Sequence, residues 1–295
     1  MSDFSNAQVW FITGSSSGFG LAMTKAALAA GHRVVATLRS PSDISSITSS
    51  HPQDQLLVLP LDVTSLPYVK SAFSTALNVF GRIDVVFNNA GYAVQAELED
   101  TPEEEARKMW EVNFWGMNYV SVEAVKCFRE RNGMGEGGER RGGLLLQNCS
   151  YGAVVGIPSF GHYSAAKHAM FGYSTTLQAE LDPTWNIRVT SILTGSFNTE
   201  SLGRSLTHRP LHPTYASSPA LVRSRAICLD RSIICGDVDD AVQIFLQVAG
   251  MERAGQPEIL PLGEDAVRIV RGRLGEIEGE VGRWEVLSDQ LVRRV

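Results

Sequence analysis

Short apolar runs recur along the first two thirds of the chain, each followed by a stretch that contains glycine or polar residues. The first run, VWFIT, is rich in β-branched and aromatic residues, which favour strands. The runs are apolar without regular polar alternation, which is typical of strands buried on both faces of a parallel sheet. The predicted strands are residues 9–13, 33–38, 56–62, 84–91 (a strand with its exit loop), 144–150 and 187–193.

The longer stretches between these runs carry the signals of helices. Gly31 and Gly81 follow two of them, and a glycine after the last helical turn is a common stop because it accepts the left-handed conformation. Pro102 and the three glutamates after it favour another helix start, since proline fits the first turn and acids complement the helix dipole. Strands joined by crossover helices predict an α/β fold, a single doubly wound parallel-sheet domain of the Rossmann type.

Three segments depart from this alternation, two of them loops. Residues 132–143 hold six glycines, so we expect a solvated loop there. Residues 200–236 contain three prolines and no long periodic pattern, and a connection this long is usually a lid or disordered. We therefore divide one domain of residues 1–295 into a core at 8–199, a lid at 200–236 and a C-terminal part at 237–295.

The third segment is the tail that begins at Glu264. Its apolar residues recur at helical spacing, and we expect an amphipathic helix packed on the body of the protein. Four glycines in the same stretch lower its intrinsic preference for a helix. The apolar positions are Val267, Val270, Leu274, Ile277, Val281 and Trp284.

Composition and charge narrow the class of protein. Of 295 residues, 44% are hydrophobic and 20% are charged, as in ordinary globular chains. The formal net charge of −6 argues against nucleic acid as the main partner. No apolar run reaches the roughly 20 residues that cross a bilayer, and no secretory signal is recognisable, so we expect a cytoplasmic protein with no membrane partner. The four cysteines lack metal-ligand spacing, and no metal is expected.

The turn after the first strand is rich in glycine. Residues 13–20 read TGSSSGFG, between a predicted strand and a predicted helix. Glycines let the backbone approach a pyrophosphate, and free N–H groups at the helix start attract it, so this context predicts dinucleotide binding. The second strand ends with Leu38 and Arg39 and has no acid there. A guanidinium pairs with a phosphate, which favours the 2′-phosphate of NADP(H) over NAD.

Further motifs follow in a fixed order. They are LDV at 61–63, NNAG at 88–91, Asn113 within VNFWG, Ser150, and Tyr163-Ser-Ala-Ala-Lys167. With the glycine-rich turn, the set resembles the short-chain dehydrogenase/reductase family from about residue 8 to residue 200. Ser150 precedes Tyr163 by thirteen residues, as in the family, and the glycine-rich loop explains the extra distance from Asn113 to Tyr163.

The resemblance implies roles for four residues. Tyr163 would exchange a proton with the substrate oxygen, and Lys167, one helical turn away, would favour the phenolate and hold the nicotinamide ribose. Ser150 would donate a hydrogen bond to the reacting oxygen. Asn113 would position a water that continues a proton relay from Lys167. The hydride itself belongs to the cofactor.

The resemblance also implies a set of cofactor contacts along the groove. After the sixth strand, Thr194 stands where the family usually has proline, while Gly195 and Thr199 follow the family pattern. The implied cofactor-binding residues are Gly14, Ser15, Ser17, Gly18, Phe19, Gly20, Arg39, Asp62, Val63, Asn89, Ala90, Gly91, Tyr163, Lys167, Phe197 and Thr199.

We therefore predict an NADP(H)-dependent oxidoreductase that transfers a hydride between the nicotinamide and the carbonyl or alcohol of a small substrate. Apolar residues in the lid suggest a fairly apolar compound. They are Leu202, Leu206, Leu211, Tyr215, Leu221 and Val222. A redox-neutral isomerase, dehydratase or cyclase on the same scaffold is the alternative, followed by a non-catalytic NADP(H)-binding regulator. Family members often pair through helices that correspond to 102–131 and 162–181, so a homodimer or homotetramer is expected.

Overall fold

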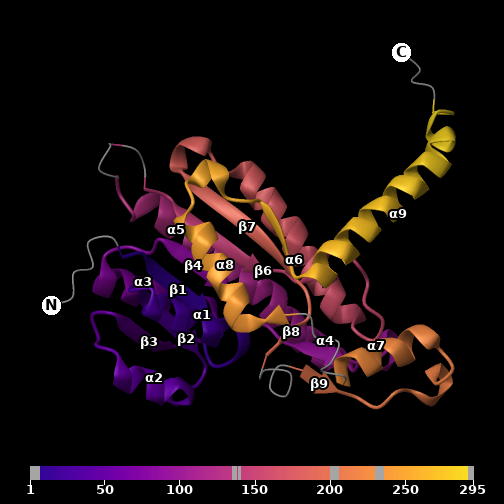
Figure 1. The fold of residues 1–295 in the computed structure, drawn as a ribbon, viewed down its shortest axis with the longest axis horizontal. Coiled ribbons are helices and arrows are strands. Elements are labelled where there is room, and N and C mark those ends of the chain that lie inside the picture. The colour runs from indigo at the N-terminus through magenta and orange to yellow at the C-terminus, as the bar shows by residue number, and fades with distance from the viewer. Residues whose placement is uncertain (1–6, 135–137, 139–140, 200–205, 230–235, 292–295) are drawn as a thin grey trace.

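The computed structural model describes residues 7–134, 138, 141–199, 206–229 and 236–291. A parallel sheet of seven strands forms its centre, and helices cover both faces (Figure 1). The strand order in the sheet is β11-β7-β6-β4-β1-β2-β3. The chain adds β2 and β3 on one side of β1 and then β4, β6, β7 and β11 on the other side, as in doubly wound folds. The strands are β1 (Val9–Thr13), β2 (Arg33–Leu38), β3 (Leu56–Pro60), β4 (Val85–Asn88), β6 (Gly143–Asn148), β7 (Ile187–Thr194) and β11 (Ile259–Leu262).

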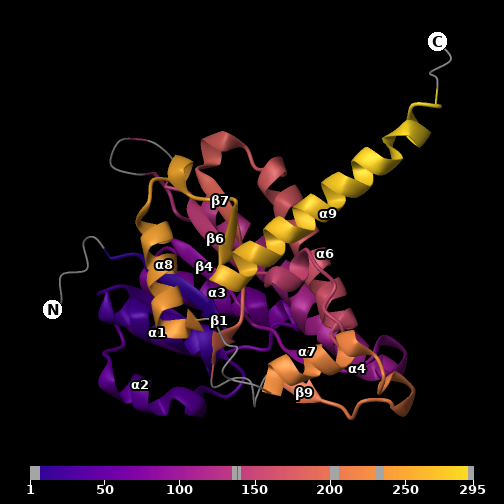
Figure 2. The same ribbon diagram turned by 45° about the vertical axis from the view of Figure 1, so that its right-hand side comes forward.

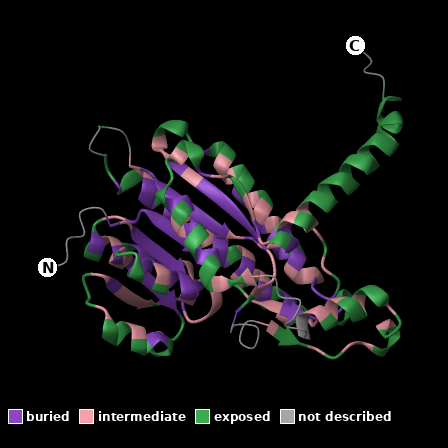
Figure 3. Ribbon diagram, in the orientation of Figure 1, coloured by how far each residue is buried: buried purple, intermediate pink, exposed green. Residues whose placement is uncertain are grey.

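Two hydrophobic layers hold the helices to the sheet. On one face, α1 and α8 pack through residues such as Met23 and Phe245. On the other, α3 and α5 pack through residues such as Phe73 and Phe128. Figure 3 shows the inner strands of the sheet as mostly buried, whereas the edge strands β3 and β11 are largely intermediate or exposed. The helices are α1 (Gly18–Ala29), α2 (Ser45–Ser50), α3 (Leu66–Phe80), α4 (Glu103–Trp110), α5 (Met117–Glu130), α6 (Gly161–Glu180), α7 (Pro219–Leu229), α8 (Val238–Gly250) and α9 (Glu264–Ser288).

Shorter elements complete the described chain. A π-helical turn, η3 (Glu111–Gly116), joins α4 to α5. Two small sheets lie outside the central one, pairing β5 (Ala93–Gln95) with β9 (Leu206–His208) and β8 (Phe197–Asn198) with β10 (Gly236–Asp237). Single 3₁₀ turns are η1 (Pro41–Ile44), η2 (Leu98–Asp100), η4 (Tyr151–Ala153), η5 (Pro183–Trp185), η7 (Pro213–Tyr215) and η9 (Arg253–Gly255).

The predicted α/β class is confirmed, and all six predicted strands are present. The seventh strand, β11, was not predicted because Pro261 interrupts its short apolar run. Pro261 is tolerated in β11 because β11 is an edge strand that pairs with β7 alone. The loop predicted at 132–143 lies partly outside the described residues. Its first residue, Asn132, is buried, and its side chain bonds the backbone of Ile83 and Gly142.

The prediction for the tail is wrong in one respect. A helix does form, but only its first turns lie against the body, where Asp265 and Ala266 are buried. From Arg271 onward every described residue of α9 is exposed, and the helix projects away from the domain (Figures 1 and 2). Helical spacing of apolar residues predicts a stripe along a helix, but it does not say which surface covers that stripe. No helix among the described residues has the length and apolar character needed to cross a bilayer.

Candidate active site

A large cavity opens at the carboxyl ends of the parallel strands, where doubly wound sheets bind their ligands. Its volume is about 1420 Å³, which exceeds the usual pocket for one small ligand and gives room for a dinucleotide beside a substrate. Most of the predicted site residues line it. They are Gly14, Ser17, Gly18, Phe19, Arg39, Asp62, Val63, Asn89, Ala90, Gly91, Ser150, Tyr163, Lys167, Phe197 and Thr199.

The turn between β1 and α1 has a backbone that glycine alone accommodates well. Gly14 and Gly18 have φ values of +70° and +52°, in the left-handed region. A Cβ on Gly20 would lie 2.2 Å from the Gly14 carbonyl oxygen, so a side chain there would collide with the turn. Ser17 begins α1 without a side-chain cap, which leaves N–H groups of the first turn to face the cavity. These features fit a pyrophosphate at the start of α1.

Three predicted residues lie behind the cavity wall instead of on it. Ser15 is fully buried, and its hydroxyl donates to the Ile12 carbonyl. Gly20 is also buried beneath the turn. Asn113 is 1% exposed within η3, where its amide accepts from the Tyr92 N–H at 3.0 Å and donates to the Tyr92 carbonyl at 2.7 Å. The Asn113 side chain therefore fixes the loop after β4, and π-helical turns such as η3 are frequent at functional sites.

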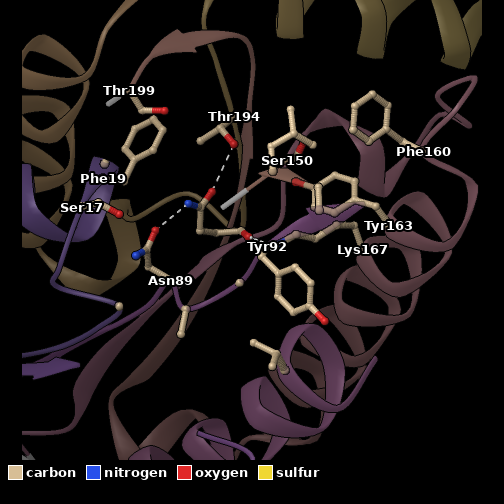
Figure 4. Close-up of a pocket in the computed structure, with 18 of the residues that line it drawn as sticks. Ser17, Phe19, Asn89, Tyr92, Ser150, Phe160, Tyr163, Lys167, Thr194 and Thr199 are labelled. Carbon is tan, nitrogen blue, oxygen red and sulfur yellow. Dashed lines mark hydrogen bonds between the residues drawn. The ribbon is translucent and has the colours of Figure 1, made fainter. Parts of the chain in front are cut away.

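A chain of amide and hydroxyl groups connects four strands along the cavity floor. Thr194 donates to the Asn148 side-chain oxygen at 3.1 Å, and Asn148 donates to the Asn89 side-chain oxygen at 2.9 Å. Asn89 in turn donates to the Thr13 carbonyl at 2.9 Å. Figure 4 shows the first two bonds as dashed lines. Thr194, which replaces the usual proline, thus contributes a hydroxyl to a network that holds β7, β6, β4 and β1 in register.

Lys167 extends beneath Tyr163 from one turn further along α6. Its ammonium donates to the Asn148 carbonyl at 2.6 Å and lies 5.7 Å from the centre of the Tyr163 ring. Lys167 is only 6% exposed, so its charge is largely removed from water. The phenol of Tyr163 and the hydroxyl of Ser150 turn toward the same part of the cavity (Figure 4). The predicted spacing of Tyr163 and Lys167 on one helix face is therefore present.

Ser150 has an unusual backbone conformation, with φ +66° and ψ +155°. Such a conformation costs of order 1–3 kcal/mol in a residue with a side chain, and it is concentrated at functional sites. The Gly152 N–H donates to the Ser150 hydroxyl oxygen at 3.2 Å, which fixes the side chain. A Cβ on Gly152 would lie 3.4 Å from the Tyr163 ring and 3.6 Å from the Ser150 oxygen, so both side chains flank one glycine.

Cys149 precedes Ser150 and is fully buried. Burial raises the pKa of the Cys149 thiol to about 12, with the charge of Lys167 opposing the shift. The thiol therefore stays protonated near neutral pH, and it is not a nucleophile.

The far end of the groove carries the residues expected to bind the adenosine part of the cofactor. Arg39 is exposed at the end of β2 and lines the cavity, as does Asp62 after β3. Asp62 accepts hydrogen bonds from the N–H and hydroxyl of Thr64, which fixes its turn. Tyr92 lines the cavity nearer Tyr163, with which it shares a small apolar cluster, and burial raises the pKa of its phenol above the ordinary value.

The substrate end of the cavity differs from the sequence prediction. Of the apolar lid residues named above, Leu206 lines the cavity, whereas Leu211, Tyr215, Leu221 and Val222 do not, and Leu202 lies outside the described residues. Sequence reasoning missed most of the actual lining because these residues belong to no motif. The lining there includes Ile157, Pro158, Phe160, Pro219, Ala220, Arg223, Ser224 and Ile227.

A buried ion pair fixes the lid segment, residues 206–229, over this end. Glu97, after β5, is 2% exposed and accepts two hydrogen bonds from Arg225 of α7, at 2.7 and 3.2 Å. The second Glu97 oxygen accepts from the His212 N–H at 3.3 Å. Arg225 also donates to the Arg209 carbonyl at 2.7 Å. One carboxylate thereby ties together both ends of the described lid segment.

The fold and the cavity together define a doubly wound α/β enzyme with a groove for a dinucleotide. The sequence matches the profile of the short chain dehydrogenase family over residues 8–209. The uncharacterized oxidoreductase C162.03 of Schizosaccharomyces pombe is 34% identical over 284 residues, which cover 96% of this chain and 91% of that protein. The chain therefore belongs to the short-chain dehydrogenase family, whose members are oxidoreductases that bind a nucleotide cofactor and small-molecule substrates.

Solved structures agree with this assignment. The crystal structure of a short-chain dehydrogenase from Streptomyces avermitilis is 28% identical, covers 99% of this chain and 100% of its own, and has a TM-score of 0.86. A short chain dehydrogenase from Burkholderia cenocepacia, solved in complex with NADP, is 24% identical, with a TM-score of 0.69. The match covers 94% of this chain and 97% of that one. The second likeness concerns the fold.

Proposed function

We propose that this enzyme transfers a hydride between NADP(H) and the carbonyl or alcohol group of a small substrate. The observation that carries the proposal is the buried Lys167, held by the Asn148 carbonyl beneath the Tyr163 ring, with Ser150 facing the same space. A phenol is a weak acid in water, and a cation one turn away favours its ionised form. This arrangement supports proton exchange between Tyr163 and a substrate oxygen near neutral pH.

Four residues of the chain have separate roles in the proposed reduction of the carbonyl group. Ser150 donates a hydrogen bond to the carbonyl oxygen from a position that its strained backbone fixes in advance. Tyr163 gives its proton to the same oxygen as negative charge develops there. Lys167 stabilises the resulting phenolate, and Asn113 holds the loop that carries Tyr92 along the cavity wall. NADPH, when bound, supplies the hydride.

The proposed preference for NADP(H) rests on Arg39. Its guanidinium lies at the end of β2 where an acid would instead favour the ribose hydroxyls of NAD. The Burkholderia relative, which carries NADP, supports the same class of cofactor. Arg39→Asp should erase or reverse the preference by about 1–3 kcal/mol, as for a charge-assisted hydrogen bond. Dissociation constants of NADPH and NADH measured by protein fluorescence test this, and equal constants in the unaltered enzyme would refute it.

The reaction is tested with a panel of aldehydes and ketones of graded size and polarity, supplied with NADPH. Loss of the NADPH absorbance with at least one carbonyl compound, and its dependence on Tyr163, is the expected result. Conversion of a substrate without net consumption of NADPH would favour a redox-neutral isomerase, dehydratase or cyclase. Tight cofactor binding without turnover of any compound would favour a non-catalytic regulator. The lid segment is expected to set which compounds react, through the cavity residues that it contributes.

A further inference from the structure

Helix α7 presents one face to the substrate end of the cavity. From Ala220 onward, its cavity-lining residues follow the i, i+3, i+4, i+7 spacing of a single helix face. They are Ala220, Arg223, Ser224 and Ile227. Among these four residues, Arg223 alone carries a charge. A single charged group among uncharged lining residues is the kind of group that fixes the orientation of a ligand in a pocket.

Two contacts fix the part of α7 that carries Arg223. The Ser224 hydroxyl donates to the Pro158 carbonyl at 2.6 Å, and Arg225 forms the ion pair with Glu97. Ser224 and Arg225 are the two residues that follow Arg223 in the helix. The backbone of Arg223 is therefore held against the loop before α6. A backbone that is fixed in advance lowers the ordering cost when its side chain binds a ligand.

The loop before α6 joins this part of α7 to the proposed acid–base pair. A Cβ on Gly152, which the two proposed catalytic hydroxyls flank, would lie 3.0 Å from the end of the Ile157 side chain. The residue after Ile157 is Pro158, which accepts the hydrogen bond from Ser224. The loop thus leads from the acid–base pair to α7 through apolar side chains that line the cavity.

Phe160, from the same loop, marks the direction in which this region extends. Its ring lies 6.3 Å from the Tyr163 ring, measured between the ring centres. Figure 4 shows Phe160 on the far side of Tyr163 from Ser17, which begins α1 where the pyrophosphate is expected to bind. The space between this loop and α7 therefore extends from Tyr163 away from the expected pyrophosphate position.

The charge of Arg223 has no partner among the residues that the structure describes. Its neighbours in the lid segment behave differently, because Arg209 pairs with Glu105 and Arg225 pairs with Glu97. No ion pair or hydrogen bond joins Arg223 to a described residue, and its side chain lines the cavity. The guanidinium is therefore available to a ligand in that cavity, whereas the other two hold the lid segment in place.

The acidic residues of the cavity lining lie at other parts of the cavity. Among the described residues they are Asp43 and Asp62, which follow β2 and β3, and Glu111, which begins η3. The nearest charge that the reacting end adds is the ammonium of Lys167, which is also positive. The described lining from Tyr163 to α7 therefore carries positive charge, and a positively charged cavity wall attracts an anion.

We infer that Arg223 binds a carboxylate of the substrate, and that the substrate is an oxo acid whose carbonyl and carboxylate are separated by an apolar segment. A guanidinium is planar and pairs with a carboxylate through two parallel hydrogen bonds. Ile157, Phe160 and Ile227 would cover the apolar segment. This inference rests on the proposed function, since the carbonyl carbon would gain a hydride and its oxygen a proton. The product would be the corresponding hydroxy acid.

The first test compares oxo acids with their methyl esters, in a series with apolar spacers of graded length. The ester keeps the carbonyl and the spacer but removes the charge, so the ratio of the two kcat/KM values measures the selection for the carboxylate. We expect the wild-type enzyme to prefer the acid at one spacer length, because the backbone of Arg223 is fixed. Arg223→Gln should lower this ratio about tenfold or more, as expected for the loss of a charge-assisted hydrogen bond.

Two further variants make the comparison specific. Arg271→Gln removes the same charge from an exposed residue of α9 outside the described cavity lining, and its ratio should stay within about twofold of wild type. Arg223→Lys keeps the charge without the planar pair of donors, so its ratio should lie between those of wild type and Arg223→Gln. Equal ratios in wild type and Arg223→Gln at every spacer length would overturn the inference.

A binding measurement separates this inference from the proposed function. The hydroxy acid and its methyl ester are titrated by calorimetry into the enzyme with saturating NADPH, a mixture that contains no carbonyl to accept the hydride. We expect the acid to bind more tightly than its ester in wild type, and Arg223→Gln to remove that difference. This result without turnover of any oxo acid would support the carboxylate subsite and contradict the proposed hydride transfer. Turnover of carbonyl compounds without such a difference would overturn the subsite and leave the proposed function intact.

The affinity for NADPH distinguishes a substrate carboxylate from a phosphate of the cofactor as the partner of Arg223. Because the region under α7 extends away from the expected pyrophosphate position, the dissociation constant of NADPH in Arg223→Gln should stay within about twofold of wild type. Protein fluorescence measures this constant without any substrate. A loss of NADPH affinity as large as the loss of selection for the acid would overturn the inference and assign Arg223 to the cofactor.

Discussion

Single residues at the carboxyl edge of the sheet occupy positions that packing alone would not favour. Lys167 is a buried cation, and removing an ammonium from water costs several kcal/mol unless partners compensate. Ser150 holds a strained backbone conformation two residues from Gly152, whose N–H fixes the Ser150 hydroxyl. Buried charges and strained backbone conformations, which cost stability, are concentrated at functional sites. The two residues face one cavity beside Tyr163, which makes a catalytic reason the simplest physical account.

Thr194 offers a test of the amide network that lines the floor of that cavity. Thr194→Val keeps the shape of the side chain but removes the hydroxyl that donates to Asn148. The half-buried Asn148 oxygen then lacks this donor, so the free energy of unfolding should fall by about 1–1.5 kcal/mol. Urea unfolding measures the change. Thr175→Val, at an exposed hydroxyl that bonds its own helix, is the control and should cost less than about 1 kcal/mol. Equal losses in the two variants would show that the network adds no stability.

The sequence predicted these residues unequally well. Ser150, Tyr163 and Lys167 could be predicted because their spacing and their positions after a strand or on one helix face bring them together. Asn148 could not, since its role is to bridge Asn89 and Thr194 from adjacent strands, and no local pattern signals such a bridge. Asn113 was predicted as a site residue, but its contacts with the Tyr92 backbone depend on the π-helical turn.

At the scale of elements, the connection of α7 to the core depends on one carboxylate. Burial alone would raise the pKa of Glu97, but hydrogen bonds from Arg225 and the His212 N–H outweigh it and hold the pKa below the ordinary value of 4.5. The ionised carboxylate therefore stabilises the attachment of the lid segment at any pH above the ordinary pKa of Glu97. This stabilisation is lost as the pH falls through the lowered pKa. The lid should stay attached at neutral and mildly acidic pH.

Glu97→Gln tests this attachment. The amide leaves Arg225, whose side chain is 14% exposed, without its charged partner, and the cost should stay below the about 3–5 kcal/mol of a pair in which both groups are buried. We expect KM for the carbonyl substrate to rise at least about tenfold, with NADPH affinity unchanged, because the lid covers only the substrate end. Steady-state kinetics with Glu103→Gln as control, an exposed residue paired with Arg107, measures the effect. A KM equal to that of the control would refute the anchoring role.

The elements that could be predicted are those with uniform local signals. The strands from β1 to β6 in the central sheet are mostly apolar runs, β7 mixes apolar with polar residues, and Gly31 and Gly81 mark helix ends as expected. Strand β11 escaped prediction because an edge position tolerates Pro261, which would be excluded from the centre of a sheet. The ion pair that attaches helix α7 joins Arg225 to Glu97, 128 positions apart in the sequence. A contact between such distant residues produces no periodic pattern in the sequence, so it could not be predicted.

At the scale of the whole molecule, His32 couples stability to pH. It follows α1 and stacks on Trp10, and its Nδ1 accepts a hydrogen bond from the Gln8 N–H at 3.3 Å. Burial lowers the pKa of His32 below its ordinary value of 6.5, with the charge of Asp84 opposing the shift. The unfolded chain therefore binds a proton more readily, and stability declines as pH falls below that ordinary value.

Urea unfolding at about pH 7.5 and pH 5.5 measures this decline, since the two values bracket the ordinary pKa of histidine. The free energy of unfolding should be lower at the acidic pH. His32→Gln, which cannot titrate, should show a smaller difference between the two conditions. An identical pH dependence in wild type and His32→Gln would show that other groups account for it.

The central claim is that Tyr163 exchanges the proton that accompanies hydride transfer. The most direct measurement is the single-turnover rate of NADPH oxidation in Tyr163→Phe, with a saturating carbonyl substrate and separately measured NADPH affinity. Tyr92→Phe, at another tyrosine that lines the same cavity, is the matched control. The account predicts a rate lower by roughly 10² to 10⁴ in Tyr163→Phe, with unchanged NADPH affinity and a control rate near wild type. A normal rate in Tyr163→Phe would contradict it.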